Sequence, residues 1–276
     1  MEEKKFIDIE TLFRNKNPAL LKWIPDFLMT YLKKILHQNE VNDFMFRNRD
    51  KKGSDFCNQV IKEFNITIDA KGTENIPLEG GFIFASNHPL GGMDAMIIVS
   101  IFSKFRKDIK FIVNDLLLNL TNLQGLFVGV NKVGKNANSS LQIVDELFAS
   151  QEAVFVFPAG LVSRKKNGII RDLEWKKTFI TRAKKHKKNI VPVFMDGELT
   201  NFFYRLANFR NAIGIKANIE MLYLADELYR QKNKTVTIIF GQPIPYTLFT
   251  KEKTDLEWAA WMKEKSYSLD DRFKKD

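Results

Sequence analysis

Between residues 66 and 241, short apolar segments alternate with longer segments of helical periodicity, and this alternation restricts the possible folds most. Strand-like segments rich in β-branched and aromatic residues occupy 66–72, 82–86, 110–115, 126–130, 153–157, 189–195 and 235–241. Helical patterns mark 94–105, 140–150, 173–188 and the tail after Asp255. Strands that alternate with helices pack as layers around one sheet. We therefore predict an α/β fold in which helices flank a mixed sheet.

The N-terminal segment differs, because it has helical patterns and no strand-like stretch. Its clearest part is 18–37, where apolar residues recur at helical spacing and lysines fall on the opposite face. Proline is costly inside a helix and favoured at its first position, so Pro25 predicts a short helix before it and a longer helix after it. We expect an N-terminal amphipathic helical domain, 1–64, and an α/β domain, 65–276.

The amphipathic segment 18–37 admits two interpretations. Such a helix can lie in a membrane interface, and the same pattern suits a helix packed on the protein's own core. The chain begins MEEKKFIDIE, which lacks the apolar core of a signal peptide, and no stretch has the ~20 apolar residues that span a bilayer. We expect a cytoplasmic protein that binds peripherally to the inner face of the cell membrane.

Charge and cysteine content restrict the partners and the compartment. With 43 Lys plus Arg and 33 Asp plus Glu, the chain has a formal net charge of +10, which attracts anionic lipid, an acidic carrier protein or nucleic acid. Cys57 is the only cysteine, so an intramolecular disulfide is excluded and a reducing compartment is expected. With three scattered histidines besides, we predict no metal site and no cofactor.

The candidate chemistry lies in Ser-Asn-His-Pro-Leu-Gly-Gly-Met-Asp, residues 86–94. A strand ends at Asn87 and His88, and Asp94 begins the next predicted helix after five intervening residues. Ligands of α/β sheets gather at the carboxyl ends of strands, and a carboxylate beside a histidine can fix its tautomer for proton transfer. Gly91 and Gly92 allow close approach of a substrate or simply permit the turn. The alternative is a structural loop histidine beside a helix-capping aspartate.

This stretch resembles the histidine–aspartate box of the glycerolipid acyltransferase superfamily, the family of bacterial lysophosphatidic acid acyltransferases. Three further stretches resemble the family's later blocks, in the same order: LFVGVNKVGK at 126–135, FVFPAGLVSR at 155–164 and NIVPVF at 189–194. The resemblance covers about residues 65–245. It implies that His88 is the catalytic base with Asp94 behind it, and that Asn131 and Lys132 bind substrate.

The third block departs from the family's proline–glutamate–glycine–threonine–arginine pattern. It reads Pro-Ala-Gly-Leu-Val-Ser-Arg from residue 158, so the glutamate is missing and the arginine comes two positions late. In the family these two residues are associated with gripping a glycerol phosphate acceptor, so the departure implies a different acceptor. Besides Asn131 and Lys132, the predicted substrate-binding residues are Asn87, Gly91, Gly92, Pro158, Ala159, Gly160, Ser163 and Arg164.

The stretches VNDLLLNL, FPAGLVSRKK and DLEWKKTF are similar to a hemolysin-like branch of the superfamily in Bacteroidetes, which is linked to acylation of amino-acid-containing lipids. The resemblance implies transfer of a fatty acyl group from acyl carrier protein or coenzyme A to the hydroxyl of a lyso-lipid. Lys132 and Arg164 would bind an anionic head group or the phosphate of the carrier. A lyso-amino-acid lipid is the favoured acceptor, and lysophosphatidic acid is the next.

Two other functions stay open at this point. A hydrolase could use the same His88 with water in place of the acceptor hydroxyl, although no Gly-x-Ser-x-Gly motif indicates a serine lipase. A non-catalytic basic protein could bind lipid or nucleic acid. The lysine runs at 184–188 lack interleaved aromatic residues, so we expect no nucleic-acid partner.

Overall fold

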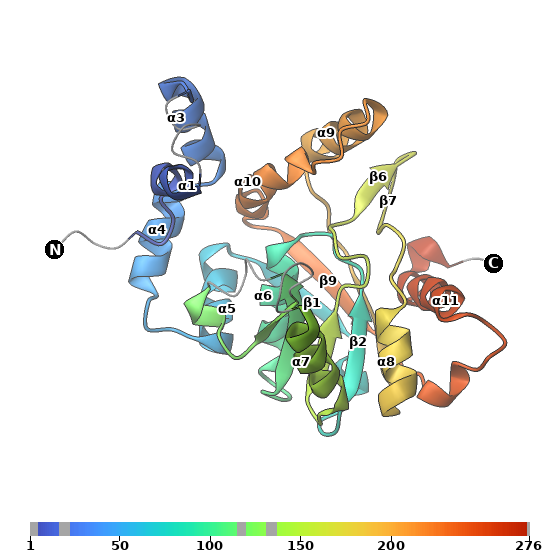
Figure 1. Ribbon diagram of the computed structural model, residues 1–276. Coiled ribbons are helices and arrows are strands. Elements are labelled where there is room, and N and C mark those ends of the chain that lie inside the picture. Colours follow the sequence, from blue (N-terminus) through green and yellow to red (C-terminus); the bar gives the residue numbers. More distant parts are fainter. Residues whose placement is uncertain (1–4, 17–22, 115–119, 131–136, 275–276) are drawn as a thin grey trace. The chain divides into compact units, whose positions relative to one another are not determined.

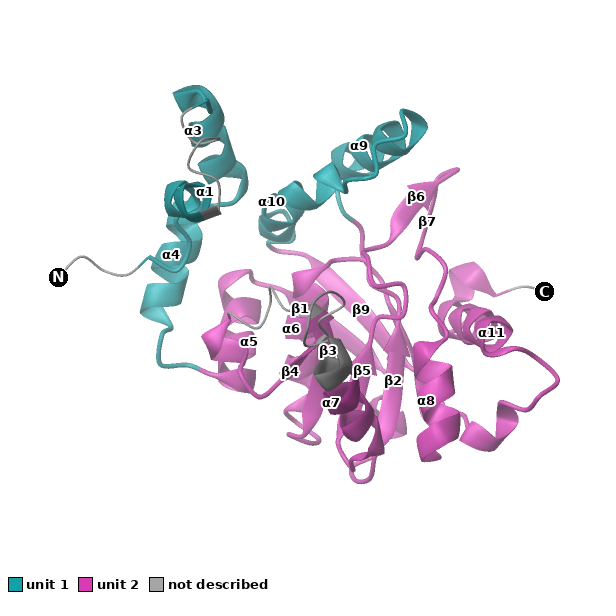
Figure 2. Cartoon of the chain, in the orientation of Figure 1, with its two compact units in different colours: residues 1–51, 199–232 teal, residues 52–198, 233–276 magenta. Residues whose placement is uncertain are grey.

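The structure is a computed structural model that describes residues 5–16, 23–114, 120–130 and 137–274 (Figure 1). The chain forms two compact units (Figure 2). The smaller unit contains residues 1–51 and 199–232, and the larger unit contains 52–198 and 233–276. The sequence pattern places a single boundary near residue 64, whereas the smaller unit takes in a second segment from far along the chain. The membrane-docking role expected of the N-terminal segment stays a prediction.

A mixed sheet forms the centre of the larger unit, as the alternating sequence pattern predicts. In the described residues it has seven strands in the order β1-β9-β8-β2-β5-β3-β4. Their bounds are β1 Thr67–Lys71, β2 Phe82–Ser86, β3 Ile109–Asn114, β4 Phe127–Val130, β5 Ala153–Val156, β8 Ile190–Met195 and β9 Thr235–Phe240. The five strands from β8 to β4 are parallel, β9 is antiparallel to β8, and β1 is parallel to β9. Each predicted strand segment matches one of these strands to within one residue at either end.

A separate antiparallel hairpin joins β6, Arg164–Lys166, to β7, Ile169–Arg171. The sequence analysis does not predict it. Asn167 and Gly168 form its two-residue turn, and both have positive φ values, 50° and 79°. Two consecutive residues of positive φ are typical of the type I′ turn, for which Asn-Gly is the preferred pair. The third sequence block therefore runs directly into a hairpin.

Helices cover both faces of the sheet. The helices of the larger unit are α5 Gly53–Glu63, α6 Gly92–Phe102, α7 Ala137–Ala149, α8 Thr178–His186 and α11 Asp255–Tyr267, with short 3-10 helices η1 Thr73–Asn75, η3 Thr121–Leu123, η5 Tyr246–Leu248 and η6 Asp271–Phe273. Side chains of α7, α8 and α11 share one apolar cluster with Ile83 and Ala85 of β2. Successive strand side chains point to opposite faces, so Phe84 belongs to the other face. There its ring meets Phe102 of α6 edge-on at 4.9 Å.

The helix expected from residue 173 begins later, at Thr178. The preceding residues form a loop because their polar groups bond elsewhere. The Trp175 Nε1 donates to the Asp172 carboxylate over 2.8 Å, and the Lys176 amide donates to the Pro158 carbonyl over 3.1 Å. The Trp175 side chain is fully buried in the cluster beneath the sheet. These tertiary contacts outweigh the local helical periodicity.

The smaller unit is helical. Its elements are α1 Ile9–Lys16, α3 Asp26–Ile35, α4 Gln38–Arg47, α9 Asn201–Ala212, η4 Ile219–Tyr223 and α10 Leu224–Tyr229. Pro25 is the N-cap of α3, so the longer helix predicted after this proline is confirmed. The shorter helix predicted before it falls mostly on 17–22, outside the described residues. In the described parts of the chain, no helix is long and apolar enough to cross a bilayer.

Candidate active site

The candidate site lies where β2 ends in the larger unit. The strand ends at Ser86, and Asn87 and His88 leave the sheet at its carboxyl edge. On the neighbouring strand, Phe157 directly follows β5 and stacks on the His88 ring with the centroids 4.0 Å apart. A loop histidine is therefore fixed in orientation by packing. This is the edge of an α/β sheet at which ligands gather.

His88 and Asp94 meet as the sequence predicts. The His88 Nδ1 and the Asp94 Oδ2 are 2.7 Å apart. The sequence pattern suggested that Asp94 begins the helix. In the structure Gly91 is the N-cap instead, and Asp94 lies three residues further on. Gly91 has φ 66° and ψ −128°, a backbone conformation that side-chain-bearing residues rarely adopt. The Leu90 amide also donates to the Asp94 carboxylate, so the five-residue spacer closes as a tight turn.

The electrostatics of this pair suit proton transfer. Burial raises the pKa of the fully buried Asp94 carboxyl, and its hydrogen bond with His88 opposes that rise. With Asp94 ionised, the short contact assigns the ring proton to Nδ1 and leaves a lone pair on Nε2. No described residue forms a hydrogen bond with Nε2, and the His88 side chain is 19% exposed. The pair can act as a general base oriented by a carboxylate.

Asp172 is a second buried carboxylate at the site, and the sequence analysis missed it. Its Oδ1 accepts hydrogen bonds from the His88 amide, at 3.1 Å, and from the Ser163 hydroxyl, at 2.6 Å. The Ser163 amide in turn donates to the His88 carbonyl over 2.8 Å. The peptide groups on both sides of His88 are thus held, one by Asp172 and the other by Ser163 of the third sequence block. Burial raises the pKa of the Asp172 carboxyl, while its hydrogen bonds from Ser163 and Trp175 oppose the rise.

The other predicted site residues are placed in different ways. The Asn87 amide side chain exchanges two hydrogen bonds of 2.7 Å with the backbone of Met195. Arg164 is 9% exposed, and its Nη1 donates to the Val162 carbonyl over 2.7 Å. Pro158 and Ala159 are buried, whereas Gly92 and Gly160 are exposed. Asn131 and Lys132 lie outside the described residues. The structure therefore brings His88, Asp94 and Ser163 together.

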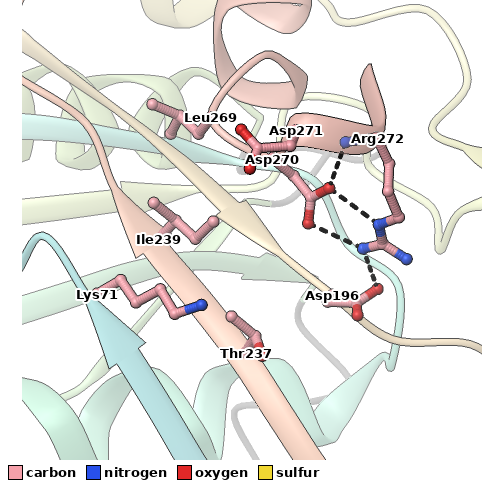
Figure 3. Close-up of a pocket in the computed structure, with 8 residues that line it drawn as sticks. All are labelled: Lys71, Asp196, Thr237, Ile239, Leu269, Asp270, Asp271 and Arg272. Atoms are coloured by element: carbon pink, nitrogen blue, oxygen red, sulfur yellow. Dashed lines mark hydrogen bonds and ion pairs between the residues drawn. The ribbon is translucent and has the colours of Figure 1, made fainter. Parts of the chain in front are cut away.

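A pocket of about 340 Å³ lies elsewhere in the larger unit (Figure 3). None of the predicted site residues lines it. Arg272 occupies its rim and pairs with Asp196 at 2.8 Å and with Asp270 at 2.9 Å. The charges drawn in Figure 3 are thus largely paired with one another, and the pocket contains no histidine. The His88 site is the better candidate for chemistry.

Comparisons with known proteins show what the chain is similar to. The sequence profile of the acyltransferase family matches residues 11–275. Two relatives are each named lyso-glycine lipid O-acyltransferase. The protein from Bacteroides thetaiotaomicron is 46% identical over 264 residues, which cover 95% of this chain and 97% of the relative. The protein from Phocaeicola vulgatus is 42% identical over 264 residues, which cover 95% of each chain.

A solved structure is also similar. The crystal structure of the 1-acyl-sn-glycerophosphate acyltransferase from Thermotoga maritima matches with a TM-score of 0.49 and 17% sequence identity, over 90% of this chain and 97% of that chain. The family profile and the two relatives extend over nearly the whole sequence, including the His88 site and the sheet that carries it. The chain therefore belongs to the acyltransferase family.

Proposed function

We propose that the protein transfers a fatty acyl group from a thioester to the hydroxyl of a lyso-amino-acid lipid, with His88 as the general base. The observation that carries the proposal is the 2.7 Å contact between the His88 Nδ1 and the buried Asp94, which leaves Nε2 available. The donor is a thioester of acyl carrier protein or coenzyme A. The lipid acceptor suits a protein that works at the inner face of the cell membrane.

The reaction follows from this geometry. The His88 Nε2 takes the proton of the acceptor hydroxyl as the oxygen attacks the thioester carbonyl, and Asp94 stabilises the imidazolium that forms. The tetrahedral intermediate collapses, and the carbon–sulfur bond breaks. The proton held by His88 passes to the leaving sulfur, so the products are an ester and a free thiol. His88 returns to its starting state, and no covalent acyl-enzyme is needed.

The third block supports an amino-acid lipid as the acceptor. A phosphate monoester usually needs a dense cluster of cationic and amide donors. Here Ala159 stands in place of the family's glutamate, and the Arg164 guanidinium donates to a backbone carbonyl through Nη1. An apolar turn suits a head group with one carboxylate and an acyl chain beside it. The names of the two relatives, which specify a lyso-glycine lipid, point the same way.

A side-by-side assay tests the proposal. The purified protein receives one acyl thioester donor with lyso-glycine lipid, with lysophosphatidic acid, or with no acceptor. We expect ester formation mainly in the first arm. A clear preference for lysophosphatidic acid would overturn the acceptor while leaving the chemistry of His88 intact. Thiol release at the same rate without an acceptor would indicate a hydrolase instead.

A further inference from the structure

The outward face of α9 has no role in the chemistry described above. One side of this helix is buried: Phe203, Tyr204 and Ala207 are at most 2% exposed. The opposite side carries large apolar side chains among polar ones: Phe209 is 62% exposed and Ile213, just after the helix, is 53% exposed, while Arg205 and Asn208 are exposed too. The outward side is therefore a surface without a covering partner in the described chain.

Apolar exposure continues beyond the helix. The large apolar side chains exposed on this segment are Phe202, Phe209, Ile213, Ile215, Ile219 and Leu222, at 52%, 62%, 53%, 40%, 36% and 51%. Single exposed apolar residues are ordinary on protein surfaces, whereas a concentration in one segment marks a site of interaction. We call the exposed side chains of residues 201–222 the α9 face.

The charges of this segment indicate what covers it. No Asp or Glu occurs from 199 to 219, while Arg205 and Lys216 are exposed. Glu220, the first carboxylate after this stretch, is fully buried and paired with Arg210 at 2.8 Å, and the only exposed carboxylate that borders the stretch is Glu198 on its N-terminal side. The α9 face thus combines apolar side chains with exposed cations and with no exposed carboxylate up to Ile219. This combination is complementary to a bilayer surface that carries anionic lipid.

We propose that the α9 face is a membrane-docking surface that binds bilayers containing anionic lipid. This proposal rests on the proposed function in one respect, because an enzyme with a lipid acceptor must reach that acceptor at a bilayer. Its apolar side chains enter the boundary between head groups and acyl chains, and Arg205 and Lys216 pair with lipid phosphates. The α9 face is distinct from the N-terminal segment, to which the sequence pattern alone assigned membrane contact.

The two surfaces are connected within the smaller unit. The hydroxyl of Tyr31 on α3 lies 2.8 Å from the hydroxyl of Tyr223 on η4. The ring of Phe202 on α9 meets the Tyr223 ring edge-on at 4.9 Å. α3 itself exposes 76% of Phe27. Once one of the two surfaces has bound a bilayer, the other is held close to the same bilayer. Binding through both surfaces is therefore tighter than binding through either one alone.

Vesicle binding by the full chain tests the proposal. Co-sedimentation is measured without substrates, using vesicles of phosphatidylcholine alone and of phosphatidylcholine with phosphatidylglycerol in equal parts. We expect Phe209→Glu with Ile213→Glu to weaken binding to the anionic vesicles by at least about tenfold. The matched control is Leu141→Glu with Ile143→Glu on α7 of the larger unit, where the native side chains are 51% and 52% exposed. The control should bind within about twofold of the parent.

A second double variant separates loss of binding from misfolding. Arg205→Gln with Lys216→Gln leaves every apolar side chain in place and should remove most of the preference for anionic vesicles. Unchanged binding by the apolar variant, or an unchanged preference in the charge variant, would overturn the proposal. The proposal would also be overturned if the apolar variant lost self-association and kept vesicle binding, because the α9 face would then be an interface between copies of the chain. Turnover in detergent micelles reports on acyl transfer separately from vesicle binding. Absence of turnover by the parent protein in micelles would therefore contradict the proposed function alone.

Discussion

In the larger unit, phenylalanine side chains lie inside: Phe84, Phe102, Phe155 and Phe240 are each at most 1% exposed, and the Phe102 ring contacts the other three. In the smaller unit, rings such as Phe27, Phe202 and Phe209 are 52% to 76% exposed. At these positions the same residue type builds a close-packed support in the larger unit and an apolar surface in the smaller unit. Packing of the first kind fixes a loop histidine, whereas exposure of the second kind suits contact with lipid.

The largest expected effect separates the two units completely. His88→Ala should lower turnover by at least ~10²-fold, because the base is lost, and should leave vesicle binding unchanged. The matched control is His186→Ala, since His186 also contacts a carboxylate, that of Asp145, at 2.9 Å but lies on α8. Near-normal turnover by a folded His88→Ala protein would break the assignment of chemistry to this site.

Asp94→Asn should come next, with turnover reduced by ~10²-fold or more, because an amide cannot stabilise the imidazolium. The Asn side chain keeps the shape of Asp but replaces one acceptor oxygen with an NH2 donor, so the melting temperature is measured as a control for the fold. Steady-state kinetics distinguish a loss in kcat, which we expect, from a rise in KM. Full activity would mean that another group orients His88.

Asp172→Asn should have a smaller effect, about tenfold on kcat, because the His88 peptide loses a charged acceptor but keeps its bond from the Ser163 amide. The charge of Asp172 also contributes to raising the pKa of Asp94. Catalysis needs ionised Asp94, so activity is lost as pH falls through its raised pKa. Removing the neighbouring charge lowers that pKa, and the acid limb of the kcat profile should move to lower pH. A merely structural role would leave the limb in place.

In the smaller unit, Phe27→Asp with Leu28→Asp should weaken binding to anionic vesicles by about tenfold and leave micellar turnover unchanged. The native side chains are 76% and 38% exposed, so the fold does not depend on their burial. High salt should weaken the residual binding without abolishing it, since apolar contact is not screened. Loss of the circular dichroism signal of the α/β unit would instead show that this side of α3 is core.

The smallest effect concerns surface charge in the larger unit. Arg182, Lys185 and His186 on α8 surround Asp145 on α7 and hold its pKa at about 2, below the usual value. A depressed carboxyl pKa stabilises the fold above its unfolded value near 3.8, and this stabilisation is lost as pH falls toward 2. Asp145→Asn should lower the melting temperature at pH 7 by about 2 °C, with the difference shrinking below pH 4. A difference that persisted at pH 2 would contradict this origin.

Much of the fold is visible in the sequence because the central strands β2, β5 and β8 are buried apolar runs, and each of the seven described strands of the main sheet was predicted within two residues. The β6–β7 hairpin was missed, since Arg164–Lys166 has no apolar alternation, although Asn167 and Gly168 are a recognisable turn pair. α9 was missed because its exposed side mixes Phe202 and Phe209 with polar residues such as Arg205, which conceals the helical period.

The site was predictable only where it is local in the chain. His88 and Asp94 are six residues apart, so one motif contains both. Asp172 is 84 residues from His88, directly before the stretch 173–188 whose periodicity indicated a helix, and only the folded sheet brings the two together. Position in a family block predicted Arg164 as a substrate contact, but the sequence could not show that its Nη1 donates to the Val162 carbonyl.

Asn87 has a consequence for how the site could be altered. Its side chain donates to the Met195 carbonyl and accepts from the Met195 amide, the two bonds that a neighbouring peptide group would make. The side-chain amide thus imitates the main chain and continues the pairing of β2 with β8 where the backbone turns away. Aspartate could replace the acceptor but not the donor, and glutamine is one methylene too long for the same register. The residue type at the position before His88 is therefore restricted by the hydrogen bonding of the sheet, independently of any substrate.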